Sequence, residues 1–224
     1  MDDSTNIVSN NLTCPLCGNS PLHFYHQDKS RSYWVCQGCK LVSVDPAQHL
    51  SDQQEKAEYD LHQNDCYDQG YRQFLSKLIT PLLNHLPEKS QGLDFGCGPG
   101  PALATMLAEK GFAVACYDKF YQPDTSVLNK RYTFITATEV LEHLAEPRKV
   151  LDKLWEILEP GGFLAVMTKR VKDKQAFQRW HYKQDLTHII FFADQTMQWL
   201  AHHWQVSILY QSVDVVIFKK DDPV

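Results

Sequence analysis

The sequence of 224 residues predicts an α/β fold: a doubly wound, mostly parallel sheet with an antiparallel C-terminal hairpin, preceded by a small metal-binding module. Three observations predict it. Two Cys-x2-Cys pairs lie near the N-terminus, segments of strand and helix character alternate from residue 92 onward, and two apolar runs in tight succession end the chain. Alternating strands and helices are typical of parallel sheets covered by helices.

The composition excludes several classes of protein. With 43% hydrophobic residues and a net charge of −5, the chain is not disordered, because disorder combines low hydrophobicity with high net charge. No apolar run approaches the roughly 18 residues of a membrane span, and the acidic, polar start lacks the features of a secretory signal. We therefore expect a cytoplasmic protein with no membrane segment. The net charge mildly disfavours nucleic acid as a partner but leaves a local basic patch possible.

The N-terminal cysteines have the spacing of a zinc ribbon. Two Cys-x2-Cys pairs are separated by 18 residues and form the set Cys14, Cys17, Cys36 and Cys39. Four thiolates form a closed tetrahedral site with no position for water, so we expect a structural zinc ion. His23 and His26 are competing ligands, and four reduced cysteines in a loop-rich arm are the alternative. Residues 23–26 and 32–35 read as the two arms of a hairpin between the pairs.

The chain divides into three predicted regions: a zinc-ribbon-like module at 10–45, a helical connector or lid at 46–90, and a core at 91–220. Ser51 and Asp52 are plausible N-caps for a helix in the polar first half of the connector. Apolar residues at helical spacing around Pro81 then predict an amphipathic helix or helix pair. Within the core we expect strands at 92–95, 112–118, 132–138 and 162–168, helices at 102–110, 148–158 and 194–203, and a hairpin of 204–210 with 213–218.

A glycine-rich turn follows the first core strand, in the sequence Leu93-Asp-Phe-Gly-Cys-Gly-Pro-Gly100. Glycines at a strand-to-helix turn allow a ligand to approach the backbone closely. The spacing departs from the dinucleotide-binding fingerprint, and the acidic Asp94 would repel a pyrophosphate. An amino-bearing or cationic ligand suits the turn better.

This turn resembles the first motif of class I S-adenosylmethionine (SAM)-dependent methyltransferases. Further matches follow in order over roughly residues 70–220: Tyr117-Asp118, the stretch from Phe134 to His143, and the stretch from Leu158 to Val166. The resemblance implies a Rossmann-like methyltransferase fold with SAM as cofactor. The preceding ribbon and the segment from Trp180 to His188 are similar to a bacterial group of methyltransferase-domain proteins.

The resemblance also implies a set of cofactor-binding residues. Gly96, Gly98 and Gly100 would lie beneath the methionine part of SAM, Asp94 near its amino group, Asp118 at the ribose and Glu139 along the site. The sequence departs from the family pattern in the region that would contact the adenine of SAM. Only about 13 residues, 119–131, separate the second strand from the third, where the family usually fits a further helix and strand. Phe120 or Tyr121 would then cover that face.

Proton removal from an acceptor needs a base, and the candidates are His143 and His188, the latter with Asp185 three residues earlier. The alternative for His143 is a positional role near SAM. Tyr59, His62, Tyr67 and Tyr71 precede the core helix and could form a lid.

The sequence thus favours a SAM-dependent methyltransferase acting on a small molecule, at oxygen. Two alternatives stay open: a methyltransferase that recognises RNA or protein through the ribbon, and a non-catalytic SAM-binding protein.

Overall fold

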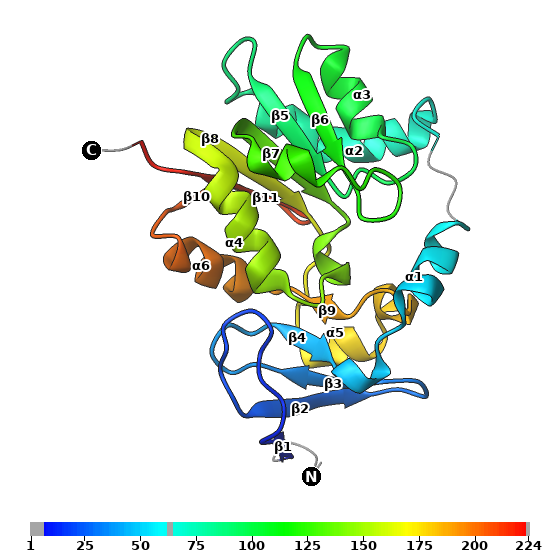
Figure 1. Ribbon diagram of the computed structural model, residues 1–224. Helices are drawn as coiled ribbons and strands as arrows, with labels where there is room; N and C mark the ends of the chain where they lie inside the picture. Colours follow the sequence, from blue (N-terminus) through cyan, green and yellow to red (C-terminus); the bar gives the residue numbers. More distant parts are fainter. Residues whose placement is uncertain (1–6, 62–64, 223–224) are drawn as a thin grey trace.

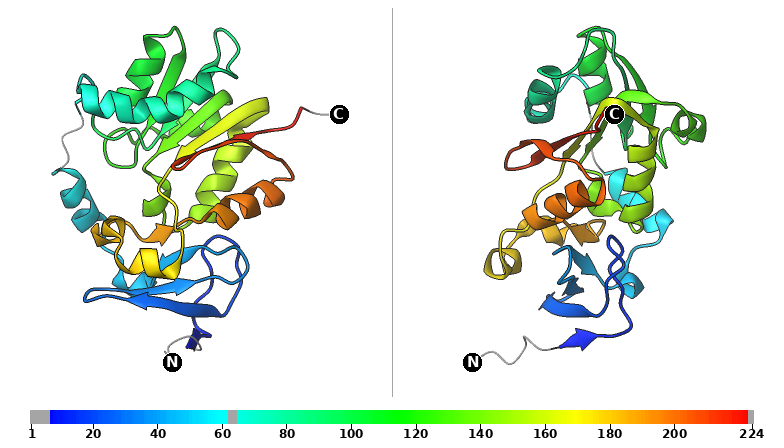
Figure 2. Two further views of the ribbon diagram at one scale, coloured as in Figure 1. Left: turned by 180° about the vertical axis from the view of Figure 1, so that it is seen from behind. Right: turned by 90° about the vertical axis from the view of Figure 1, so that its left-hand side faces the viewer.

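Two sheets, one small and antiparallel and one large and mostly parallel, organise the chain (Figure 1). The computed structural model describes residues 7–61 and 65–222. Figures 1 and 2 show the small sheet at the N-terminal end of the molecule, with the large sheet and its helices beyond it. Within the described ranges, no helix has the length and apolar character needed to cross a bilayer.

The large sheet has the strand order β10-β11-β8-β7-β5-β6. Its four parallel strands are β5 (Gln91–Phe95), β6 (Ala113–Tyr117), β7 (Tyr132–Thr138) and β8 (Leu158–Met167). The hairpin of β10 (Ile208–Gln211) and β11 (Val215–Lys219) adds two antiparallel strands, with β11 against β8. The predicted parallel sheet with an antiparallel C-terminal hairpin is confirmed.

Helices cover both faces of this sheet. One face packs on α2 (Gln69–Leu83) and α3 (Ala102–Ala108), and the other packs on α4 (Pro147–Ile157) and α6 (Asp194–His203). Successive residues of β11 point to opposite faces of the sheet. Ile217 packs in the core with α2 and α3, and Phe218 packs in the core with α4 and α6. α2 packs on the sheet through apolar residues at helical spacing, as the sequence predicts. It continues through Pro81 as a single helix.

The connection between the second and third core strands is short, as the sequence predicts. A 3-10 helix, η3 (Thr125–Asn129), fills the connection from β6 to β7. No strand is assigned between them in this fully described stretch, so β6 is an edge of the sheet.

The small sheet has the order β1-β2-β3-β4-β9 and is antiparallel throughout. Its strands are β1 (Val8–Ser9), β2 (Leu22–Gln27), β3 (Ser32–Val35), β4 (Val42–Val44) and β9 (Ile190–Phe191). The β2–β3 hairpin was predicted, but β9 was not. Because β9 comes from the C-terminal half of the chain, the N-terminal module and the core share this sheet: Val42 pairs with Phe191 and Ser43 with Ile190.

A third apolar core holds the two halves together. It lies between the small sheet and a segment with α5 (Lys174–Gln178) and η5 (His181–Gln184). The rings of Tyr33 and Phe177 meet edge to face at a centroid distance of 5.1 Å, and Phe177 meets Phe191 at 5.3 Å. Aromatic packing of this kind adds to the stabilisation from burial.

The connector begins with η2 (Pro46–Gln48) and α1 (Asp52–Tyr59). Of the two predicted N-caps, Ser51 caps α1, and its side chain accepts a hydrogen bond from the backbone N–H of Gln54. Asp68 caps α2 in the same way. Figure 1 shows α1 beside the space between the two sheets, to the right in that view.

We expect Gly92→Ala to destabilise the large sheet by about 1–3 kcal/mol, because an added Cβ would lie 2.1 Å from Cζ of Phe134. Chemical denaturation of the wild type and the variant measures the loss. The double variant with Phe134→Leu removes the clash, so its loss should fall short of the sum of the single losses by about 1 kcal/mol or more. Fully additive losses would contradict this contact.

Candidate active site

A cavity of about 680 Å³ lies at the carboxyl ends of β5, β6 and β7. Its wall includes the glycine-rich turn, residues 117–121, α1, and the loop at 185–189. The volume is within the range of about 300–1,000 Å³ that is usual for small-molecule sites, and ligands of open parallel sheets bind at this edge.

The glycine-rich turn forms one end of the cavity. Gly96 and Gly98 have φ angles of 74° and 65°, a region that favours glycine. A Cβ on Gly96 would lie 2.3 Å from Cγ2 of Val140, so only glycine fits against that side chain. Gly96 and Gly98 both line the cavity.

Asp118 ties this turn to the next loop. Its carboxylate accepts hydrogen bonds from the backbone N–H of Gly98 at 3.1 Å, of Phe120 at 2.8 Å and of Tyr121 at 3.1 Å. Asp118, Phe120 and Tyr121 all line the cavity. The predicted ribose-binding carboxylate and the two predicted aromatic covers are thus in one place.

Two of the predicted cofactor-binding residues, Asp94 and Gly100, are not among the residues that line the cavity. Asp94 is buried beneath the turn, where its carboxyl accepts a hydrogen bond from Thr136 Oγ1 at 2.8 Å. Burial raises the pKa of Asp94 to about 7. This placement makes Asp94 a support of the turn, and its contact with a cofactor stays a prediction.

Two carboxyl groups lie near the end of β7, one half-buried at the cavity and one fully buried. Glu139, with φ of 52°, follows β7, and Glu142 lies in η4 (Leu141–His143). The Tyr182 hydroxyl is hydrogen-bonded to Glu142 Oε1 and lies 3.2 Å from Glu139 Oε2. Burial and the neighbouring Glu142 raise the pKa of Glu139 to about 8, and burial raises the pKa of Glu142.

The two histidines predicted as bases meet at this wall. The ring centroids of His143 and His188 are 4.7 Å apart. His143 Nδ1 is 3.0 Å from the Thr187 carbonyl oxygen, and His188 Nδ1 is 2.7 Å from that of Tyr182. Because a carbonyl only accepts, each Nδ1 carries the hydrogen and each neutral ring has its lone pair on Nε2. Burial lowers the pKa of His188.

Asp185 does not orient His188 as the spacing suggested. Its Oδ2 is 3.7 Å from His188 Nε2, and its Oδ1 accepts hydrogen bonds from the Thr187 backbone at 2.9 Å and hydroxyl at 2.6 Å. Asp185 is therefore a charged neighbour of His188 rather than its hydrogen-bond partner, because Thr187 holds its Oδ1. The Tyr182 carbonyl sets the orientation of His188 instead.

The loop that carries His188 is held by Arg31, which follows β2. The buried guanidinium donates to the carbonyls of Asp185 and Leu186 at 3.0 Å, of His188 at 2.9 Å and of Lys183. From the same turn, Asp28 forms an ion pair with Lys183 at 3.1 Å. The N-terminal module therefore fixes one wall of the cavity.

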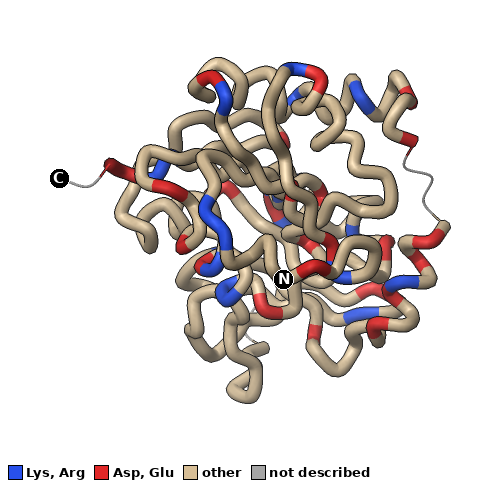
Figure 3. The backbone as a smooth tube through the Cα atoms, turned by 45° about the horizontal axis from the view of Figure 1, so that its top comes forward, with Lys and Arg blue, Asp and Glu red and all other residues tan. Residues whose placement is uncertain are grey.

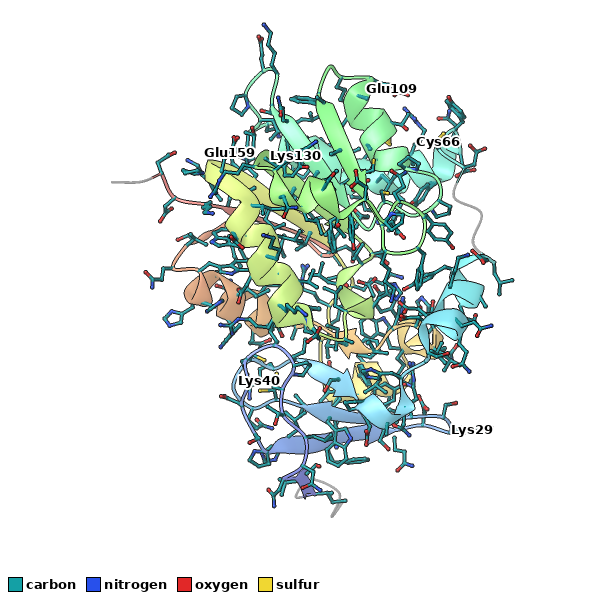
Figure 4. The ribbon with its side chains drawn as sticks, in the orientation of Figure 1. Lys29, Lys40, Cys66, Glu109, Lys130 and Glu159 are labelled. Atoms are coloured by element: carbon teal, nitrogen blue, oxygen red, sulfur yellow. The ribbon has the colours of Figure 1, made fainter. Side chains whose placement is uncertain are left out.

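The four cysteines of the predicted zinc site come together. Their sulfur atoms lie within 4.8 Å of one another, with Cys14 and Cys39 at 3.5 Å and Cys17 and Cys36 at 3.3 Å. Ligands about 2.3 Å from a tetrahedral zinc ion are separated by about 3.8 Å, so the arrangement fits that ion. Figure 4 shows Lys40, which follows this cluster, far from Cys66.

The connector contributes to the cavity through α1. Lys119 forms ion pairs with Glu55 at 2.6 Å and Asp52 at 3.3 Å, and Tyr121 donates to Asp60 at 2.7 Å. Of the predicted lid residues, Tyr59 and Tyr71 line the cavity, Tyr67 is exposed away from it, and His62 lies outside the described residues. The ring of Tyr59 packs edge-on against His143 at 5.2 Å.

Sequence reasoning missed Glu142 and Arg31. Glu142 directly precedes His143, so its position in the same motif was a usable signal. Arg31 carried no such signal, because the carbonyls that it binds are more than 150 residues away in the chain.

Comparisons with known proteins agree with this geometry. The model of a methyltransferase domain family matches residues 67–210. A ubiquinone biosynthesis O-methyltransferase from Yersinia pestis is 26% identical over 157 residues, which cover 55% of this chain and 64% of that protein. The chain thus spans less than two thirds of the length of the curated relatives that it matches.

Solved structures share the fold at low identity. The 1,6-didemethyltoxoflavin-N1-methyltransferase of Burkholderia thailandensis, bound to 1,6-didemethyltoxoflavin and S-adenosylhomocysteine, has a TM-score of 0.52 and 17% identity, covering 90% of this chain and 99% of that chain. A protein from Pyrococcus horikoshii has a TM-score of 0.54 and 13% identity, covering 74% and 99%. These likenesses establish the fold alone.

We expect Arg31→Met to lower the free energy of unfolding by about 3–5 kcal/mol, because four carbonyls of the 183–188 loop lose their donor. Denaturant titration measures the loss. Hydrogen exchange at the amide of Ile189, which donates to the Glu142 carbonyl at 2.8 Å, should also become faster.

Arg179→Met is the matched control, since Arg179 is exposed beside α5. Its effect should stay within about 0.5 kcal/mol. Equal stability of the two variants would show that Arg31 does not hold the loop.

Proposed function

This chain belongs to the methyltransferase domain family, and we propose that it transfers a methyl group from SAM to a hydroxyl group of a small molecule. The single observation that carries the proposal is the cavity itself. A glycine-rich turn with Asp118 lies at one end, and the imidazoles of His143 and His188 line another wall with the carboxyl of Glu139.

The residues of the first end fit SAM. The backbone of Gly96 and Gly98 would hold the methionine part, Asp118 the ribose hydroxyls, and Phe120 and Tyr121 the adenine face. When bound, SAM supplies an electrophilic methyl group on its sulfonium. The chain contributes alignment of acceptor, methyl and sulfur, together with exclusion of water by α1.

The imidazole wall favours an oxygen acceptor. A hydroxyl must lose its proton during methylation, and His143 and His188 each present Nε2 as the acceptor nitrogen. The carboxylate of Asp185, whose Oδ2 lies 3.7 Å from His188 Nε2, adds negative charge that stabilises a proton taken up there. The Yersinia relative, by its name, is an O-methyltransferase, which supports the same atom.

A small acceptor suits the cavity and the charge. Lys and Arg are interspersed with Asp and Glu along the chain (Figure 3), and the net charge is −5. A nucleic-acid substrate usually meets a basic surface. The alternative is an RNA or protein substrate gripped by the N-terminal module, and the observation in its favour is the cysteine cluster, a common feature of macromolecule-binding modules.

We also propose that the cysteine cluster holds a structural zinc ion. All four groups are thiols, and three of them are buried, so the site is closed to substrate. Its role is to fix the turn from which β3 and β4 extend, and through them Arg31 and β9.

Isothermal titration with SAM tests cofactor binding by the reduced, zinc-loaded protein. We expect binding by the wild type and a loss of tenfold or more in Asp118→Asn, because the amide can no longer accept from Gly98, Phe120 and ribose together. Asp124→Asn, an exposed change in the same connection, should bind SAM as the wild type does. Absence of SAM binding by the wild type would refute the function.

The acceptor class is tested with methyl-labelled SAM in a cell extract depleted of endogenous SAM. We expect label in the low-mass fraction with the wild type and none with Asp118→Asn. Label in RNA or protein would favour the macromolecular alternative. SAM binding with no transfer into any fraction would favour the non-catalytic SAM-binding protein.

Zinc content tests the cysteine cluster. We expect Cys39→Ser to lose about one equivalent of zinc relative to the wild type and to unfold at a lower temperature, because the closed site contributes folding energy. Cys66→Ser is the matched control, since Cys66 lies outside the cluster. Equal zinc content in the wild type and Cys39→Ser would contradict the assignment.

A further inference from the structure

Glu142, His143 and His188 form a second cluster of metal-ligand type, separate from the cysteines. One carboxylate oxygen and one nitrogen from each ring all lie within 4.8 Å of one another. Ligands about 2.1 Å from a shared ion are separated by about 3.0–3.5 Å. Side-chain movements of about 1 Å would therefore complete the site.

The two imidazoles are oriented as metal ligands usually are. Each donates Nδ1–H to a backbone carbonyl, His143 to Thr187 and His188 to Tyr182. Such a bond fixes the tautomer with the lone pair on Nε2 and makes that nitrogen a better ligand. Thr187 lies within the 183–188 loop that Arg31 holds, and Tyr182 directly precedes that loop, so the orientation is built into the fold.

The carboxylate is buried and incompletely satisfied. Glu142 is fully buried, its Oε1 accepts from the Tyr182 hydroxyl, and its Oε2 has no hydrogen-bond partner among the described residues. A buried carboxylate oxygen without a partner is costly, and a coordinated cation removes that cost. Tyr182 then acts as the group that orients the carboxylate.

We propose that Glu142, His143 and His188 bind a divalent first-row transition-metal ion at the wall of the cavity. Two imidazoles favour such an ion over Mg²⁺ or Ca²⁺, which prefer oxygen ligands throughout. Three protein ligands leave coordination positions open, in the pattern of catalytic rather than structural sites. His143 and His188 line the cavity, so those positions are accessible to an acceptor.

The consequence for catalysis rests on the proposed function. With the ion bound, His143 and His188 act as ligands rather than as bases. Coordination lowers the pKa of the acceptor hydroxyl, so its proton passes to water without a strong base. The acceptor oxygen then forms the bond to the methyl carbon, the carbon–sulfur bond breaks with its electron pair on sulfur, and one proton is released. The substrate class is an alcohol or phenol whose oxygen coordinates the ion.

Metal binding is tested on the zinc-loaded full chain with Mn²⁺ as the probe, followed by the loss of the EPR signal of the free ion. Thiolates select softer ions, so Mn²⁺ reports on this site rather than on the cysteines. We expect about one Mn²⁺ per chain in the wild type. His188→Asn and Glu142→Gln should each weaken Mn²⁺ binding tenfold or more. The asparagine side chain can still donate an N–H to the Tyr182 carbonyl but lacks the Nε2 ligand, and the glutamine amide lacks the negative charge of the carboxylate.

His202→Asn, an exposed change on α6, is the matched control and should bind Mn²⁺ as the wild type does. His143→Asn replaces either variant that fails to fold, as judged by thermal unfolding. Absence of Mn²⁺ binding by the wild type, or equal binding by all folded variants, overturns the site.

SAM titration of the same variants separates the two proposals. We expect SAM affinity to change less than threefold in His188→Asn while Mn²⁺ binding is lost. Methyl transfer into the low-mass fraction should fall tenfold or more after chelation and return with Mn²⁺. Transfer that is undiminished by chelation would overturn the catalytic role of the ion, whereas failure to bind SAM would overturn the proposed function and leave the metal site standing.

Discussion

Backbone carbonyls of residues 183–188 converge on the guanidinium of Arg31, and the cavity depends on this convergence. A loop with so many carbonyls turned inward is stable only where a donor of fixed geometry satisfies them. Once the loop is held, the Tyr182 and Thr187 carbonyls orient His188 and His143. A residue of the N-terminal module thus determines the conformation of a wall that belongs to the methyltransferase domain.

The N-terminal module and the methyltransferase domain therefore pack together as one structural unit. The small sheet takes its last strand, β9, from the C-terminal half, and the rings of Tyr33, Phe177 and Phe191 fill the space between them. A ribbon joined only by a flexible connector would leave the 183–188 loop without support. The cysteine cluster gains its importance from this, because it anchors the turns from which β3 and β4 extend.

The cavity has two chemically different walls. At the glycine-rich turn, Asp118 accepts a hydrogen bond from the backbone N–H of Gly98, and both residues line the cavity. At the imidazole wall, Glu142 is buried and Glu139 is half-buried, and desolvation raises the pKa of both carboxyls. Under the proposed function, this arrangement would place SAM beside a wall that accepts a proton or binds an ion, as methylation of a hydroxyl requires.

The sequence by itself determined the parallel sheet, its C-terminal hairpin, the cysteine cluster and the glycine-rich turn with Asp118, because each depends on local spacing and periodicity. It brought forward His143 and His188 as candidates, with Asp185 beside His188, and the structure places Asp185 Oδ2 3.7 Å from His188 Nε2. Only the tertiary structure decided that Thr187 holds Asp185, that Tyr182 joins Glu139 and Glu142, and that Arg31 holds the loop. The contacts of Arg31 join residues more than 150 positions apart, and those of Tyr182 join residues 40 and 43 positions apart. Such contacts leave no local pattern in the sequence, since they depend on how distant segments pack.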